Sequence, residues 1–256
     1  MGRPRAKPAA FLVPQVRASS LGEPLSSIGV SAQPDAGGGD RSSALEAAPR
    51  PRARGWIHRV AVLVAGPAGI FLVVVAPTGA ARIAVAIYAL SLVTVFWVSS
   101  TYHRGSWSAE EFARWQRRDH AAIFLLIAGS YTPDCVLALD GAWRMSMLAG
   151  VWVVAGLGVL MKLYRADLHV LSGVMYLGLG WAAVIASPQF VRVLSPAVLI
   201  LTVAGGLLYS LGALVLALHR PKLFPRTFGY HEVWHAATAA AAACHYVAVL
   251  LILIDA

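Results

Sequence analysis

Long apolar runs, separated by short polar connections, fill the chain from residue 56 onward. Each run is close to the roughly 20 residues that a helix needs to cross about 30 Å of hydrocarbon, and Pro, Gly or charged residues mark most of the connections. The pattern predicts an all-α, polytopic membrane protein with seven transmembrane helices, at residues 57–76, 82–102, 119–139, 143–162, 168–187, 193–217 and 231–254.

The first 55 residues have a different composition. They are rich in Pro, Gly, Ala, Ser and Arg and lack periodic apolar positions, which is typical of disorder. We expect a disordered basic tail over residues 1–55 and a membrane domain over residues 56–256. The only apolar cluster of the tail, residues 11–13, is too short for a signal peptide, so we expect the mature chain to keep its N-terminus.

Composition and charge agree with a membrane protein. Of the 256 residues, 58% are hydrophobic and 13% are charged, and the mean hydropathy is +0.67, which excludes an ordinary soluble domain. The net charge of +9 does not indicate a nucleic-acid partner, because Lys and Arg lie in the tail and in short loops. Eighteen of the 21 Lys and Arg residues fall on one side of the seven helices. This side is predicted to be cytoplasmic, so the N-terminus lies in the cytoplasm and the C-terminus outside the plasma membrane.

Three histidines form the main candidate site. Ionisable residues are costly in a membrane and are therefore functional candidates. With the predicted topology, His103 ends the second helix and His231 and His235 begin the seventh, all at the cytoplasmic side. His231 and His235 are four residues apart and share one helix face. If the two helices are neighbours, the three imidazoles can hold one Zn²⁺ ion and leave a position for water.

Two further polar residues share this depth. Asp119 begins the third predicted helix and is a candidate to accept a proton from zinc-bound water, and Ser99, one turn before His103, is a candidate to contact the same water or a substrate carbonyl. Each residue also has an ordinary explanation. A single histidine can cap a helix or lie at the interface, Asp119 can interact with the helix dipole, and Ser99 can bond to its own helix.

The remaining polar residues carry weaker predictions. His245 lies about 21 Å deeper along the last helix than His231, so it can line a cavity but cannot bind the same ion. Asp134 is a buried carboxylate without a predicted partner, and Cys135 and Cys244 are expected to pack as small apolar groups without forming a disulfide. Other histidines are expected to have interfacial positions or to point elsewhere: His58, His120, His169 and His219.

The letters from His231 to His235 also match the H-E-x-x-H pattern of zinc proteases, with Glu232 as general base. Intramembrane metalloproteases add an aspartate ligand from another span. In this chain Asp140, which is followed by Gly141, is the candidate for that ligand. The charge count places Asp140 on the opposite side of the membrane, roughly 30 Å from His231. This separation is too large for a shared metal, so protease chemistry is the weaker hypothesis.

Four segments resemble the bacterial haemolysin III family, which is related to the progestin and adiponectin receptors. They are residues 99–103 (SSTYH), 118–133 (RDHAAIFLLIAGSYTP), 229–235 (GYHEVWH) and 243–246 (ACHY). The resemblance extends from about residue 54 to the C-terminus. It implies a seven-helix fold with a cytoplasmic N-terminus and a zinc ion near that side. It also implies roles for Ser99, His103, Asp119, His231 and His235.

The resemblance implies a hydrolase or, alternatively, one of two non-enzymatic functions. The receptor relatives imply a zinc-dependent hydrolase of a lipid amide or ester, with a membrane lipid as substrate. The name of the bacterial branch implies instead a pore-forming cytolysin, and a receptor-like protein with a structural zinc is a third possibility. A pore needs a row of polar residues through the membrane, and the outer half of the spans offers only Asp134 and His245. This scarcity weighs against a pore. Small residues such as Gly205 and Gly206 predict no oligomeric state.

Overall fold

A computed structural model describes residues 51, 53–165, 167–221, 223–224 and 227–255. Within this part of the chain the secondary structure is helical and no β-strand occurs. The first helices in chain order are α2 (Trp56–Val75), α3 (Gly79–Arg104), α4 (Ala109–Ala138) and α5 (Gly141–Tyr164). They are followed by α6 (His169–Gly180), the 3₁₀ helix η1 (Ala182–Ala186), α7 (Ser187–Val193), α8 (Pro196–Leu218) and α9 (Tyr230–Asp255).

Seven helical segments of the described residues are long and apolar enough to cross a membrane, with α6, η1 and α7 together forming one of them. This confirms the predicted all-α fold with seven spans, and the protein is a multi-pass integral membrane protein. Most of the predicted tail, residues 1–55, lies outside the described residues. Its last residues, 53–55, form a turn that leads into α2, and the amide of Ala53 donates a hydrogen bond to Thr227 O at 3.2 Å.

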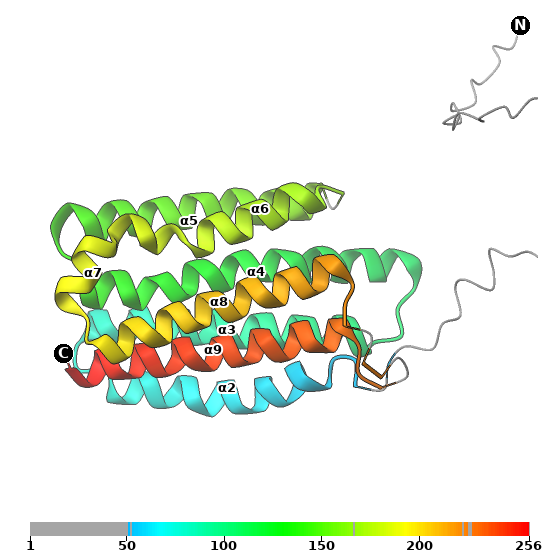
Figure 1. Ribbon diagram of the computed structural model, residues 1–256, viewed down its shortest axis with the longest axis horizontal. Coiled ribbons are helices and arrows are strands. Elements are labelled where there is room, and N and C mark those ends of the chain that lie inside the picture. Colours follow the sequence, from blue (N-terminus) through cyan, green and yellow to red (C-terminus); the bar gives the residue numbers. More distant parts are fainter. Residues whose placement is uncertain (1–50, 52, 166, 222, 225–226, 256) are drawn as a thin grey trace, which may run out of the picture. The chain divides into compact units, whose positions relative to one another are not determined.

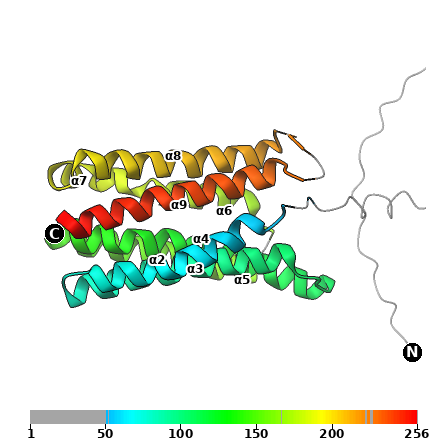
Figure 2. The ribbon, with the colours of Figure 1, turned by 90° about the horizontal axis from the view of Figure 1, so that it is seen from below.

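The helices run side by side with alternating directions (Figures 1 and 2). Each of α2, α3, α4 and α5 packs against the next, α8 packs along α9, and α2 also contacts α9. One apolar core joins α2, α3, α4 and α9 around Tyr88 and Phe96, and a second joins α4 to α5, α6 and η1 around Phe124. The starts of α2, α4, α6 and α9 meet the ends of α3, α5 and α8 at one end of the bundle (Figure 1).

Helix α4 begins earlier than the sequence analysis predicts. Ser108 and Glu111 form a capping box, in which the Ser108 side chain accepts from the Glu111 amide at 3.3 Å and Glu111 Oε2 accepts from the Ser108 amide at 3.0 Å. Such a box satisfies two backbone donors that would otherwise lack partners. The helix therefore starts at Ala109, ten residues before the predicted start at Asp119. The prediction that Asp119 begins this helix was wrong.

The fifth span is also not the single helix predicted over residues 168–187. α6 ends at Gly180, and the chain continues as η1 and then α7. The Tyr131 hydroxyl of α4 donates to Gly180 O at 2.9 Å and accepts from the amide of Ala183 at 2.7 Å. In a membrane, backbone groups released by a helix break need such partners. Pro188, which follows the predicted end of this span at residue 187, lies in the first turn of α7, where proline is well tolerated.

Candidate metal centre

Three histidines from two helices meet at the end of the bundle that gathers the starts of α2, α4, α6 and α9. His103 lies in the last turn of α3, and His231 and His235 lie in the first two turns of α9. Their ring centroids are 4.7 Å apart for His103–His231, 4.9 Å for His103–His235 and 4.6 Å for His231–His235. The spacing of four residues on α9 places both of its imidazoles on one face, opposite His103.

The ring nitrogens of this cluster lie close to the separation that a metal ion requires, and one pair has that separation. His103 Nε2 and His231 Nε2 are 3.2 Å apart, and one ligand atom from each of the three histidines lies within 4.8 Å of the others. Nitrogens bound tetrahedrally to zinc at about 2.0–2.1 Å lie roughly 3.4 Å from one another. One pair already has this spacing, and small side-chain rotations would bring His235 to it. The donor set, three neutral imidazoles, also suits zinc.

The cluster is only partly shielded from its surroundings. His235 is buried, with 3% of its surface exposed, whereas His103 and His231 are half-buried. The bundle therefore holds the innermost ring firmly and leaves the outer two accessible. An ion held here would have buried protein on one side and an approach for a small group on the other.

A fourth imidazole, which the sequence analysis assigned to an interfacial position, joins this cluster. His58 of α2 stacks on His235 with ring centroids 3.9 Å apart and an interplanar angle of 10°. It is 3% exposed and also contacts Phe96 of α3, at 5.0 Å between ring centroids. No local sequence signal reveals this contact, because it depends on how α2 packs against α9.

Ser99 and Asp119 lie next to each other, close to His103, which is the residue that α3 contributes to the cluster. Ser99 is 3% exposed and precedes His103 by four residues, which places it one turn deeper on the same face. Its side chain interacts with that of Asp119 on α4. Asp119 lies about 15 Å along α4 from the first residue of that helix. Stabilisation by the helix dipole, which falls off within the first turn, therefore does not explain Asp119.

The carboxylate of Glu232 is engaged away from the three histidines. Glu232 Oε1 pairs with Arg54 Nε at 2.6 Å, and Glu232 Oε2 accepts from the Gly229 amide at 2.8 Å. The residue is 2% exposed. Asp140 immediately precedes α5 at the opposite end of the bundle (Figure 1), and its carboxylate pairs with Arg144 at 2.9 Å. This geometry agrees with protease chemistry being the weaker hypothesis.

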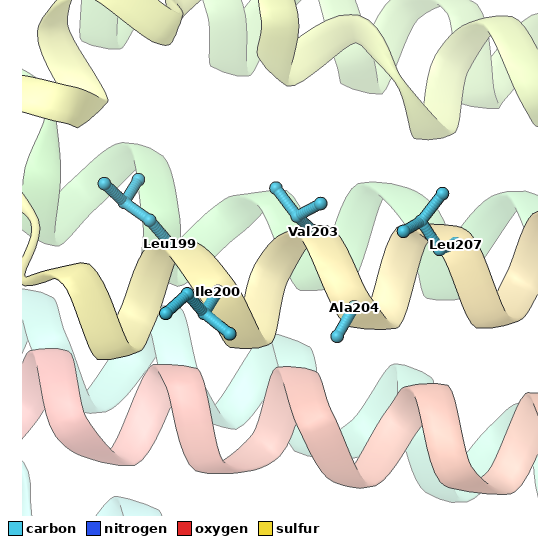
Figure 3. Close-up of a pocket in the computed structure, with 5 residues that line it drawn as sticks. All are labelled: Leu199, Ile200, Val203, Ala204 and Leu207. Atoms are coloured by element: carbon cyan, nitrogen blue, oxygen red, sulfur yellow. The ribbon is translucent and has the colours of Figure 1, made fainter.

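The other predicted polar residues are not members of the three-histidine cluster. His245 lines a cavity of about 70 Å³ together with Ser130, Tyr209 and Ser210, as its depth suggested. His120 contacts His169, with 6.1 Å between ring centroids. A larger groove of about 390 Å³ lies along α8 and is lined by apolar side chains only (Figure 3): Leu199, Ile200, Val203, Ala204 and Leu207.

Cys135 and Cys244 are both free thiols, as predicted.

Comparison with known proteins gives one family and several relatives. A family model described as Haemolysin-III related matches residues 47–246. The chain is 29% identical to Hemolysin-3 of Bacillus cereus over 182 residues, which cover 70% of this chain and 80% of the relative. It is also 29% identical to the Hemolysin-3 homolog of Bacillus subtilis (strain 168), over 75% of this chain and 89% of the relative. The Monocyte to macrophage differentiation factor of Homo sapiens is 29% identical over 64% of this chain and 67% of the relative.

Proposed function

Since the chain belongs to the haemolysin III-related family, we propose that its histidine cluster binds zinc and that it hydrolyses a lipid amide or ester. The observation that carries this proposal is the meeting of His103, His231 and His235, whose ligand atoms lie within 4.8 Å of one another. Three protein ligands with room for a fourth is the arrangement typical of catalytic zinc, whereas structural zinc usually has four protein ligands.

The residues around the cluster have the chemistry that hydrolysis needs. A zinc ion bound to three imidazoles supplies a Lewis acid and a water of lowered pKa. The Asp119 carboxylate is the proposed proton acceptor. The Ser99 hydroxyl beside it orients this carboxylate or donates a hydrogen bond to a substrate carbonyl. Glu232 is not assigned to the reaction, because Arg54 and the Gly229 amide occupy its oxygens.

The position of the cluster favours a lipid substrate. His103 ends one span and His231 begins another, so the centre lies near the boundary between the apolar core and the polar headgroups. The amide or ester carbonyl of a membrane lipid lies at this boundary, while its acyl chains extend into the apolar core. A substrate can therefore reach the half-buried His103 and His231 without leaving the bilayer.

The decisive experiment measures metal and turnover on the same detergent-purified protein. We expect elemental analysis to find about one zinc per chain in the wild type and His235→Ala to lose both the metal and the hydrolysis of lipid amides or esters. His219→Ala is the matched control, because His219 is an exposed histidine at the end of α8. Wild-type protein without zinc would contradict the proposal of a metal site, and zinc without hydrolysis of any lipid class would indicate a structural ion.

The pore-forming alternative makes a different prediction for the same variants. Dye-loaded proteoliposomes containing wild-type protein or His235→Ala would release dye equally if a pore operated independently of the metal. We expect no release from either preparation, because an ion pathway needs a row of polar groups through the bilayer, and the outer half of the described spans offers only Asp134 and His245. Equal release by both proteins would favour the pore over the hydrolase.

A further inference from the structure

His58 places an imidazole from a third helix against the histidine cluster. It lies in the first turn of α2, parallel to the His235 ring within 10° and with 3.9 Å between ring centroids. Phe96 of α3 contacts the same ring at 5.0 Å, with the planes tilted by 54°. His58 is 3% exposed, so its position is set by these contacts and not by water.

Both ring nitrogens of His58 are buried, and neither has a partner at hydrogen-bonding distance and angle within the described part of the chain, although the backbone of His235 lies nearby. A neutral imidazole has one donor and one acceptor, and a buried polar atom without a partner is costly. Such atoms are rare in native proteins and point to a water, ion or ligand that completes their hydrogen bonding. An apolar ring would fill the same space without this cost, so packing alone does not explain a histidine here.

The stacking excludes His58 as a fourth ligand of the same ion. A histidine nitrogen binds a metal in the plane of its ring, at about 2.0–2.1 Å. The rings of His58 and His235 are stacked face to face, so the nitrogens of His58 are not part of the donor set that His103, His231 and His235 would offer to an ion. They would instead be available to hydrogen-bond to a small group bound beside that ion.

We propose that His58 is a positioning residue of the metal centre, and this inference rests on the proposed zinc site. Its stacked ring fixes the orientation of His235. One of its ring nitrogens hydrogen-bonds to the water or substrate carbonyl oxygen that shares the centre with the ion. Outer partners of this kind hold ligands and bound water in place, and their loss typically weakens metal binding by 10–100-fold.

Two substitutions distinguish the effect of ring stacking from the effect of hydrogen bonding by the ring nitrogens. His58→Phe keeps a flat ring against His235 but has no polar atom, and His58→Asn keeps a hydrogen-bonding group with little stacking area. His169→Phe is the control, because His169 is an exposed histidine in the first turn of another helix, α6. Zinc affinity is measured by competition with a chelator. The visible absorption of the cobalt-substituted protein reports on the coordination of the ion independently of activity.

We expect His58→Phe to bind zinc 10–100-fold more weakly than the wild type and to change the cobalt spectrum. His58→Asn should recover part of the affinity, and His169→Phe should behave as wild type. The metal-free Phe variant should melt no lower than the metal-free wild type, since it removes two unpartnered polar atoms from the interior. This last result separates a role at the centre from a role in folding.

Three outcomes overturn the inference. The first is His58→Phe with wild-type zinc affinity and an unchanged cobalt spectrum. The second is a metal-free Phe variant that melts clearly below the metal-free wild type, because the nitrogens would then have partners in the protein itself. The third is wild-type protein that binds no metal, which removes the proposed function as well. Zinc that is lost in His235→Ala but kept in His58→Phe overturns only the role of His58.

Discussion

At the scale of single residues, Glu232 shows how side-chain contacts bear on the interpretation of a sequence motif. Its position between His231 and His235 matches the general base of a zinc protease in sequence. In space, the same carboxylate joins Arg54, just before α2, to the first turn of α9. A buried carboxylate with both oxygens engaged stabilises the structure and is poorly placed to accept a proton from water.

Glu232→Gln tests this structural role. We expect the free energy of unfolding to fall by about 1–3 kcal/mol, because the Arg54 guanidinium loses a charged partner. Zinc content and lipid hydrolysis per folded molecule should stay unchanged. Unfolding is followed by helical circular dichroism in detergent. The control is Glu110→Gln, an exposed position where a change within about 0.5 kcal/mol is expected. Lost hydrolysis at an unchanged thermal midpoint would instead support a general base.

The sequence predicts the three-histidine cluster from two observations, and neither reveals His58. The spacing of His231 and His235 fixes their common face, and the distribution of Lys and Arg sets His103 at the same depth. His58 also lies near this depth. Its contact with His235 follows from the packing of α2 against α9, which no short-range pattern encodes.

At the scale of elements, two boundaries differ from those that hydrophobicity predicts. The earlier start of α4 is signalled by Ser108 and Glu111, whose spacing is that of a capping box. Hydrophobicity alone misses this start, because the first three turns of α4 are polar. The break after Gly180 has a weaker signal, since the residues on both sides are apolar. What stabilises the break is Tyr131 on another helix, a tertiary contact.

Tyr131→Phe tests how the break in the fifth span is held. Without the hydroxyl, Gly180 O and the Ala183 amide both lose a partner in an environment with little water, and we expect a loss of about 1–3 kcal/mol in the free energy of unfolding. Amide hydrogen exchange should rise selectively over residues 181–186. Tyr164→Phe, at a tyrosine that is 78% exposed, is the matched control. Equal exchange in the two variants would show that Tyr131 does not hold the break.

At the scale of the whole molecule, the arrangement of the helix ends and the positions of the Lys and Arg residues agree on one membrane orientation. The ends of α3, α5 and α8 and the starts of α2, α4, α6 and α9 share one end of the bundle (Figure 1). These are the connections that carry most of the described Lys and Arg residues. The rule that positive charge stays inside therefore predicts that the histidine cluster faces the cytoplasm.

Cysteine labelling in intact cells tests this orientation. Asp140→Cys and Asp167→Cys place thiols at exposed connections at opposite ends of the bundle, in a background where Cys135 and Cys244 are replaced by alanine. We expect a membrane-impermeant maleimide to label position 140 directly and position 167 only after the membrane is permeabilised. The reverse pattern would place the histidine cluster outside the cell and would invalidate the charge argument.

The length of α4 has a practical consequence for observing the centre at work. Its 30 residues extend about 45 Å, well beyond the apolar thickness of a bilayer, and its start reaches past the neighbouring helix ends (Figure 1). A spin label or a rigid antibody epitope at exposed Glu110 would share one continuous helix with Asp119. Displacements of Asp119 during the proposed reaction would then be readable from a marker in water.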